Sequence, residues 1–166
     1  MKLYLVQHGE AKNKAEDPQR PLTERGRDDV ARVAAFAATA GCRVGQIRHS
    51  GKRRAEETAS ILAEYLSPAE GVVAIPGLAP RDDVRPVAEA LHPPSFSPIG
   101  GDEGAVVMFV GHLPFLDRLT SLLVTGDAEC SIVRFQKGGI VCLVREDGNW
   151  AIGWIITPDL IPKSSR

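Results

Sequence analysis

Residues 105–112 read Ala-Val-Val-Met-Phe-Val-Gly-His and form the most strongly apolar stretch of the chain. Residues 2–9, Lys-Leu-Tyr-Leu-Val-Gln-His-Gly, show a similar arrangement at its start. Continuous apolar runs of this length are typical of strands that are covered on both faces, as in a parallel sheet. We therefore predict that residues 2–7 and 105–110 are strands, each followed at once by a histidine and a glycine.

Amphipathic stretches alternate with these strands. Apolar residues at spacings of three and four predict helices over residues 26–40, 53–65, 81–91 and 113–124. Short β-favouring stretches predict strands at residues 46–49 and 72–75, and Ser50 is the expected N-cap of the helix that follows. Such alternation of strands and helices indicates a parallel sheet with helices on both faces.

The last part of the chain has a different pattern. Strand-like segments at residues 131–136, 140–145 and 150–156 are separated by glycine-containing turns, which predicts an antiparallel meander at one edge of the sheet. The expected fold is therefore an α/β three-layer sandwich, with a mostly parallel central sheet and antiparallel C-terminal edge strands. A length of 166 residues fits one domain over residues 1–162, with a loop at 92–104 and a frayed tail at 163–166.

Composition excludes several classes of function. A formal net charge of -1 provides no global field for nucleic acid or an anionic membrane, so anion binding requires a local cluster. No apolar run approaches the ~18 residues of a membrane span, and residues 3–6 are too short for a signal-peptide core. Cys42, Cys130 and Cys142 are odd in number and contain no Cys-x-x-Cys pair, which indicates neither a disulfide framework nor a zinc site. The expected location is the reducing cytoplasm.

The two histidines that follow the long strands are the candidate site. Ligands gather at the carboxyl ends of parallel strands, so His8 and His112 are expected on one rim of the sheet. A single histidine at a strand end is usually a hydrogen-bonded rim residue, whereas two at equivalent ends favour a shared site. For His49 the same rim and an exposed position are both open, and His92 is expected in a loop.

Basic residues accompany these histidines. Arg20 precedes the first helix, and Arg54 lies in the first turn of the second. A cation at a helix N-terminus opposes the helix dipole unless an anion lies over that end. Lys52 and Arg53 either share this anion or form a solvated basic turn with the glutamates that follow them.

Four ordered motifs carry a resemblance to a known family. They are His8-Gly9-Glu10-Ala11, Arg20-Pro21-Leu22-Thr23, Ser50-x-x-x-Arg54-Ala55-x-x-Thr58 and Gly111-His112-Leu113-Pro114. From residue 3 to about residue 125, the chain resembles the histidine phosphatase superfamily, which has a phosphoglycerate mutase-like fold. Its length is similar to that of the small SixA-type phosphohistidine phosphatases.

The resemblance implies a role for each matching residue. His8 would be the nucleophile, Arg54 would clamp the phosphate and His112 would stabilise the transferred group. The expected phosphate-binding residues are Gln7, Gly9, Asn13, Arg20 and Leu113. Phosphoryl transfer needs an in-line nucleophile and fixed positive charge, and no metal or other cofactor is expected. His8 must be neutral to attack, so we expect a backbone carbonyl to accept its other N–H.

The chain departs from the family at Gln7, where an arginine is usual. Glutamine keeps a hydrogen-bond donor but loses the charge and the bidentate fork. Losing one such contact in a dry site costs on the order of 2–4 kcal/mol, roughly 30- to 1,000-fold in rate. Lys52, Arg53 or Arg20 could compensate. The alternative is a degenerate module that binds phosphate without turnover.

The general acid for the leaving group is open. Glu10, Asp82 and Asp83 are candidates by position only, and each is equally explained as a surface carboxylate. Imidazole leaves more easily than an alkoxide because its protonated form has a pKa near neutrality. Weak provision of an acid therefore favours phosphohistidine over an alkyl or sugar phosphate.

The expected function is that of a metal-independent protein phosphohistidine phosphatase. Its partner would be a protein that carries phosphohistidine, such as a phosphotransfer domain, with no nucleic acid or membrane involved. The alternatives are the phosphate-binding regulatory module and a small-molecule phosphomonoesterase of the same superfamily. An NTP-dependent enzyme is disfavoured because neither Gly-x-x-x-x-Gly-Lys-[Ser/Thr] nor Gly-x-Gly-x-x-Gly occurs.

Overall fold

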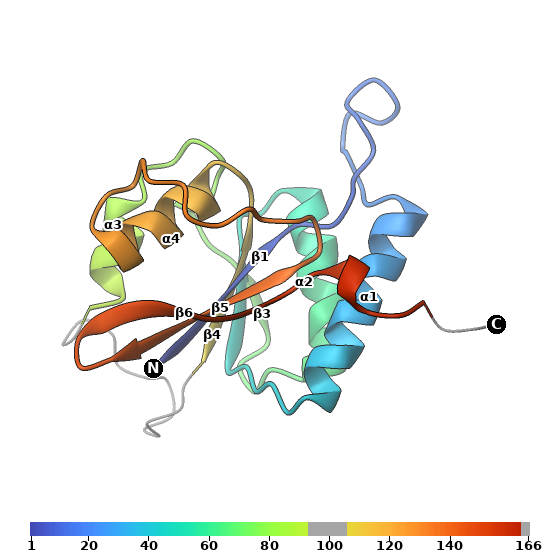
Figure 1. Cartoon of the computed structure of the whole chain (residues 1–166). Helices are drawn as coiled ribbons and strands as arrows, with labels where there is room; N and C mark the ends of the chain where they lie inside the picture. The colour runs from blue at the N-terminus through green and yellow to red at the C-terminus, as the bar shows by residue number, and fades with distance from the viewer. Residues whose placement is uncertain (93–105, 164–166) are drawn as a thin grey trace.

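The computed structural model describes residues 1–92 and 106–163, in which a six-stranded sheet has the order β3-β2-β4-β1-β5-β6 (Figure 1). The strands are β1 (Lys2–Gln7), β2 (Gln46–His49), β3 (Val72–Ala74), β4 (Val107–Gly111), β5 (Ile140–Glu146) and β6 (Asn149–Ile156). The helices are α1 (Glu24–Thr39), α2 (Arg53–Leu66), α3 (Arg85–Ala90) and α4 (Phe115–Thr125), with a 3₁₀ turn η1 (Pro158–Leu160).

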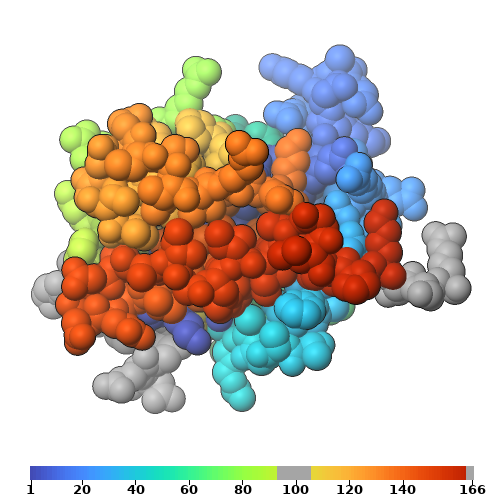
Figure 2. All heavy atoms as spheres, in the orientation of Figure 1, coloured from blue at the N-terminus to red at the C-terminus, as the bar shows by residue number. Residues whose placement is uncertain are grey.

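The sheet is parallel from β3 through β1 and antiparallel at its C-terminal edge. β1 pairs in parallel with β4, and β5 adds antiparallel to the other side of β1. β6 then pairs antiparallel with β5. The predicted α/β fold is confirmed, including the antiparallel C-terminal strands. Figure 2 shows the C-terminal segment as a continuous red-orange band across one face of the molecule.

Two apolar cores lie on opposite faces of the sheet. Tyr4 and Val6 face α1 and α2, whereas Leu3 and Leu5 face α3 and α4. Successive side chains of a strand point to opposite faces, so one unbroken apolar run supplies both cores. Figure 1 shows the two helix pairs on either side of the sheet.

The predicted strand at residues 131–136 is wrong. These residues form no strand, although Val133 and Phe135 alternate with exposed neighbours and are buried in the core beside α4. β5 already occupies the free side of β1, so the segment has no place in the sheet. Its alternation comes from a loop that packs every second side chain inward. In Figure 1 this orange segment runs from α4 to the start of β5 outside the sheet.

The third helix is shorter than the predicted range of residues 81–91. It begins at Arg85, and Pro86 lies in its first turn. A helix that began at residue 81 would place this proline in its interior, where the missing N–H would break the hydrogen-bond pattern. Asp82 instead closes a turn, because its Oδ2 accepts a hydrogen bond from the Ala79 N–H at 2.8 Å.

Two predictions fall largely outside the described residues. The loop at 92–104 is described only at His92, and the frayed tail at 163–166 only at Lys163. Among the helices of residues 1–92 and 106–163, none has the length and apolar character needed to cross a membrane.

The core beside α2 generates a stability prediction. Leu62 is completely buried in this core, whereas Leu160 in η1 is 69% exposed. We expect Leu62→Ala to lower the free energy of unfolding by about 2–5 kcal/mol, because it removes buried methyl groups and leaves a cavity. The matched Leu160→Ala change should cost less than about 1 kcal/mol. Urea unfolding measures both, and equal losses would contradict the assigned core.

Candidate active site

His8 and His112 lie side by side at the carboxyl ends of two neighbouring strands. His8 follows β1 and His112 follows β4. The backbone N–H of His8 donates a hydrogen bond to the Gly111 carbonyl at 3.1 Å. The ring centroids are 5.0 Å apart, with the ring planes tilted by 52°. Both residues are buried, at 7% and 2% exposure. The structure thus brings together the two histidines that the strand-end pattern singles out.

Hydrogen bonds fix the orientation of the His8 ring. Its Nδ1 lies 2.7 Å from the Gly9 carbonyl oxygen. A carbonyl only accepts, so Nδ1 carries the proton and Nε2 carries the lone pair. The Arg54 Nε–H donates to this Nε2 at 3.3 Å. Nε2 is therefore the ring nitrogen with an available lone pair, and the Arg54 guanidinium lies directly beside it.

Thr58 supports this arrangement from α2. Its Oγ1 accepts a hydrogen bond from the Gly9 N–H at 3.0 Å and donates to the Arg54 carbonyl at 2.7 Å. Arg54 and Thr58 are one helical turn apart, so both face the segment after β1. Thr58 belongs to the Ser50-to-Thr58 motif, but no role was expected of its side chain. Its position four residues after Arg54 is the signal that could have indicated one.

Gly9 lies in close contact with the first helix. A Cβ atom at Gly9 would come within 2.8 Å of Val30 Cγ2 and 3.1 Å of the Gly26 carbonyl. Only a residue without a side chain fits here, so the backbone after His8 rests directly on α1.

Ser50 contacts the second histidine and does not cap α2 as predicted. Lys52 is the N-cap residue of α2 and makes no side-chain capping bond. Ser50 Oγ instead lies 2.6 Å from His112 Nε2. β2 and β4 are parallel neighbours, so the residue after β2 faces the residues after β4. His112 Nδ1 is buried and has no hydrogen-bond partner among the described residues.

Burial and positive charge keep both imidazoles neutral. Burial, with smaller contributions from the charges of Arg54, Lys137 and Arg20, lowers the pKa of His8 to about 4, although the hydrogen bond to Gly9 opposes this shift. Burial likewise lowers the pKa of His112 to about 3, with smaller contributions from His8, Arg54, Lys52 and Arg20. Each imidazole therefore has a free lone pair at neutral pH.

Arg20 is held beside the site by the base of a loop. The Ala11–Leu22 bridge closes this loop, and the Arg20 Nε–H donates to the Lys12 carbonyl at 3.2 Å. Arg20 has a φ of 51°, in the left-handed region, so the chain turns sharply just before Pro21. Burial and the nearby Arg20 lower the pKa of Arg54, which shows that positive charge is concentrated here.

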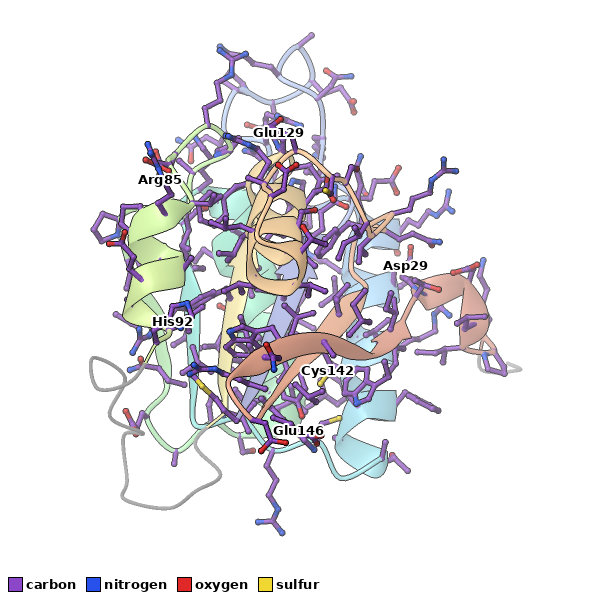
Figure 3. The ribbon with its side chains drawn as sticks, turned by 60° about the vertical axis from the view of Figure 1, so that its left-hand side comes forward. Asp29, Arg85, His92, Glu129, Cys142 and Glu146 are labelled. Carbon is purple, nitrogen blue, oxygen red and sulfur yellow. The ribbon has the colours of Figure 1, made fainter. Side chains whose placement is uncertain are left out.

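The three candidate general acids all have other partners. Glu10 Oε2 accepts a hydrogen bond from Thr23 Oγ1 at 3.1 Å. Asp82 Oδ2 accepts one from the Ala79 N–H, within a turn. Asp83 forms a paired hydrogen bond with Arg85, which holds the pKa of this exposed carboxyl down at about 2. Figure 3 shows Arg85 pointing outward from the start of α3.

The remaining expected phosphate-binding residues differ in their surroundings. Asn13 Oδ1 accepts from the Glu16 N–H at 2.8 Å, in an exposed turn, so this side chain is used locally. Leu113 follows His112 and is 39% exposed. Arg53 is paired with Glu57 at 3.0 Å, which favours the solvated basic turn for this residue. Lys52 lies close enough to lower the pKa of His112.

Gln7 is buried at the end of β1. Its Oε1 has no hydrogen-bond partner within the described parts of the chain. Its main-chain carbonyl accepts from the Gly138 N–H at 2.9 Å, so the turn before β5 is joined to the site. The neighbouring Lys137 is a basic residue whose charge lowers the pKa of His8. It was not among the expected site residues. Only the glycines after Lys137 hint at a tight turn here.

The described residues, 1–92 and 106–163, hold no cluster of metal-ligating side chains. No group of three or more His, Cys, Asp or Glu side chains in these ranges is arranged to hold a metal ion. The site formed by His8 and His112 is a pair of neutral imidazoles surrounded by cationic side chains. This combination suits the binding of a tetrahedral oxyanion.

Comparison with known proteins gives one family and several structural neighbours. The sequence model of the histidine phosphatase superfamily (branch 1) matches residues 3–82. The solved structure of the protein histidine phosphatase SixA complexed with tungstate is similar over 96% of this chain and 99% of that chain, with 25% identity and a TM-score of 0.81. No curated protein sequence matches the chain significantly.

More distant structures share the fold. The α-ribazole phosphatase from Shigella flexneri matches over 95% of this chain and 97% of that chain, with 15% identity and a TM-score of 0.73. A mycobacterial glucosyl-3-phosphoglycerate phosphatase in complex with VO₃ matches over 92% and 97%, with 16% identity and a TM-score of 0.68. At such low identity these likenesses concern the fold alone.

The neutral imidazoles generate a pH prediction. We expect His8 and His112 to titrate together toward pH 4 and 3, so that both rings stay neutral down to about pH 5. Their folded pKa values lie below the unfolded value of ~6.5, so the unfolded chain binds more protons and stability falls as the pH drops below ~6.5. NMR of the imidazole C–H resonances measures this, with the denatured chain as control. A site imidazole that titrates near ~6.5 would contradict the assigned environment.

Proposed function

We propose that this chain, which is similar to the histidine phosphatase superfamily over residues 3–82, hydrolyses phosphohistidine carried by a protein, through a phosphoryl group held on His8. Similarity to the superfamily supports phosphatase activity. The observation that carries the proposed mechanism is the hydrogen bond from His8 Nδ1–H to the Gly9 carbonyl at 2.7 Å. This bond leaves the lone pair on Nε2, which is the atom that must attack phosphorus.

The proposed reaction has two steps. In the first, a bond forms between His8 Nε2 and phosphorus while the bond between phosphorus and the substrate imidazole breaks. In the second, water attacks the phosphoryl group, inorganic phosphate leaves and neutral His8 is restored. Each step is an in-line displacement that needs little other covalent chemistry from the protein.

The cationic side chains would stabilise the transferred group. The Arg54 guanidinium now donates to His8 Nε2, and it would transfer this interaction to a phosphoryl oxygen when the nitrogen attacks. Arg20 adds charge from the loop before α1. We assign His112 to a hydrogen bond with another phosphoryl oxygen through Nε2, the nitrogen that Ser50 Oγ contacts. Fixed donors around the equatorial oxygens match the charge distribution of the transition state.

The engaged carboxylates support a phosphoramidate substrate. Glu10 and Asp82 are hydrogen bonded elsewhere, and Asp83 is held ionised by Arg85. An alkyl phosphate needs a proton donor for its leaving oxygen, whereas imidazole leaves readily once protonated by solvent. The site is therefore better suited to phosphohistidine than to a phosphomonoester.

The surface beside the site supports a large substrate. A hollow of about 710 Å³ is lined by polar side chains of α2 and by Gly51, which follows the Ser50 that contacts His112. Such an open, polar surface accommodates another protein, and a phosphotransfer domain is the partner that we propose. All three cysteines are free thiols, which agrees with the reducing cytoplasm that we propose as its location.

Two alternatives have specific support. Gln7 lacks the charge that the family usually places there, which favours a module that binds phosphate without turnover. The fold is shared with phosphatases named for small molecules, which favours a phosphomonoesterase. Hydrolysis rates for a phosphohistidine peptide and for common phosphomonoesters distinguish the second alternative from the proposal.

The phospho-His8 intermediate can be tested directly. After mixing with a phosphoramidate donor, the protein should carry acid-labile phosphate, because a phosphorylated imidazole hydrolyses in acid. His8→Ala should abolish both the label and the turnover. His92→Ala is the matched control, since Figure 3 shows His92 at the opposite end of α3 from Arg85, where its Nδ1 lies 3.4 Å from Arg145. Turnover that persists in His8→Ala would contradict the proposed mechanism.

The effect of Gln7 can be tested by restoring the charge. We expect wild-type protein to bind tungstate and to turn over substrate, and Gln7→Arg to raise kcat/KM by up to roughly 30- to 1,000-fold. Thr39→Arg adds the same charge at an exposed position at the C-terminal end of α1, at the opposite end of that helix from Glu24, and should change kcat/KM little. If wild type binds tungstate but hydrolyses no phosphohistidine, the binding module is the correct description.

A further inference from the structure

Lys137 precedes Gly138, whose backbone N–H is hydrogen bonded to Gln7, the position at which the site lacks a charge. We propose that Lys137 is a phosphate-binding residue of this protein and supplies the positive charge that Gln7 does not provide. This inference rests on the proposed function and concerns the same site. It assigns a charge from the C-terminal hairpin to a site otherwise made of residues from the first two-thirds of the chain.

The backbone joins this turn directly to the end of β1. The Gly138 N–H donates to the Gln7 carbonyl at 2.9 Å, and the Gly139 N–H closes the turn on the Gln136 carbonyl at 3.0 Å. β5 begins at Ile140, which pairs with Val6. Lys137 therefore precedes a residue that is hydrogen bonded to Gln7, the immediate neighbour of His8.

The position of the turn is fixed by packing. Gly138 has a φ of +77°, and a Cβ there would lie 3.3 Å from Val30 Cγ2. A Cβ at Gly139 would lie 2.9 Å from the Ile156 carbonyl, closer than real Cβ atoms come. The turn therefore packs closely between α1 and β6, where side chains at these two positions would not fit. The Lys137 side chain itself is exposed.

The charge of Lys137 is available to an anion. It lines a hollow of about 440 Å³ together with two arginines that are already engaged and two aspartates, Asp29 and Asp159. Arg32 pairs with Asp29 and donates to two carbonyls, and Arg25 lies 3.8 Å from Asp29. Figure 3 shows Asp29 on α1 beside the C-terminal segment that forms the other wall. Within residues 1–92 and 106–163, Lys137 has no acidic side chain at ion-pair distance.

The field of Lys137 reaches the nucleophile. It lowers the pKa of His8, by an effect that ranks directly after that of Arg54 and before that of Arg20. A cation at this position would attract a phosphoryl oxygen on the side of His8 that faces the β5 turn, while Arg54 approaches from α2. The two cations would hold the phosphoryl group from opposite elements. A lysine contributes a point charge, without the planar fork of arginine.

The test combines substitutions at both positions. Lys137→Gln should weaken the binding of inorganic phosphate and lower kcat/KM for a phosphohistidine peptide by about tenfold, because one charged contact is lost. Lys137→Arg should retain most of both. In the Gln7→Arg background, the loss caused by Lys137→Gln should shrink to less than about threefold, since the arginine then provides the charge. Lys163→Gln is the matched control from the same hollow and should change neither quantity.

Each outcome separates this inference from the proposed function. If Lys137→Gln leaves phosphate affinity unchanged while His8→Ala abolishes turnover, the role of Lys137 is wrong and the phosphatase stands. If Lys137→Gln weakens only the protein-borne substrate, Lys137 contacts the carrier protein and the inference is also wrong. If His8→Ala keeps its activity, the proposed function fails, and calorimetry with inorganic phosphate still decides whether Lys137 binds the anion. Thermal melts verify that each variant is folded.

Discussion

The register between β1 and β4 is the constraint on which the site depends. The two strands pair in parallel from Leu3 and Val107 to Gln7 and Gly111, so the residues that follow them emerge together. Both strands are buried on both faces, and side chains alternate between two different helix pairs. A slip of one residue would move every apolar side chain to the opposite core and turn His8 away from α2. The packing of the core therefore fixes the distance between the imidazoles.

Burial and positive charge act in the same direction at this site. Removing the two rings from water disfavours their charged forms, and the surrounding cations disfavour them further. A protonated imidazole could not attack phosphorus. In the mechanism that we propose, the same cations that keep the rings neutral would bind the oxyanion, so activation of the nucleophile and recognition of the substrate would share one set of residues.

The local sequence pattern was sufficient to predict those features of the structure that depend on a single strand or helix. The apolar runs at residues 2–7 and 105–110 predicted both central strands, and the position of the histidines after them predicted their common rim. Residues 131–136 were misread, because alternation cannot distinguish a strand from an extended loop whose Val133 and Phe135 pack inward. The true partner of Ser50 depends on which strands are neighbours, and this was not visible from the helix that follows it.

Residues far apart in sequence were the hardest to assign. Lys137 reaches the site only because β5 returns to pair with β1, a long-range contact that no local spacing encodes. The partners of the carboxylates were likewise invisible, because Glu10 meets Thr23 across the base of a loop and Asp83 folds back on Arg85. The sequence shows that these residues are charged. Only the fold shows which of these charges are already paired with another residue.

The backbone hydrogen bond between Gly138 and Gln7 has a consequence for the folding of the protein during its synthesis on the ribosome. His8 leaves the exit tunnel more than a hundred residues before His112, and the turn that closes on β1 emerges later still. A nascent chain that stops short of β5 would have one side of β1 unpaired and no turn beside its nucleophile. The surroundings of His8 are therefore completed only after β5 has been synthesised, more than a hundred residues after His8 itself.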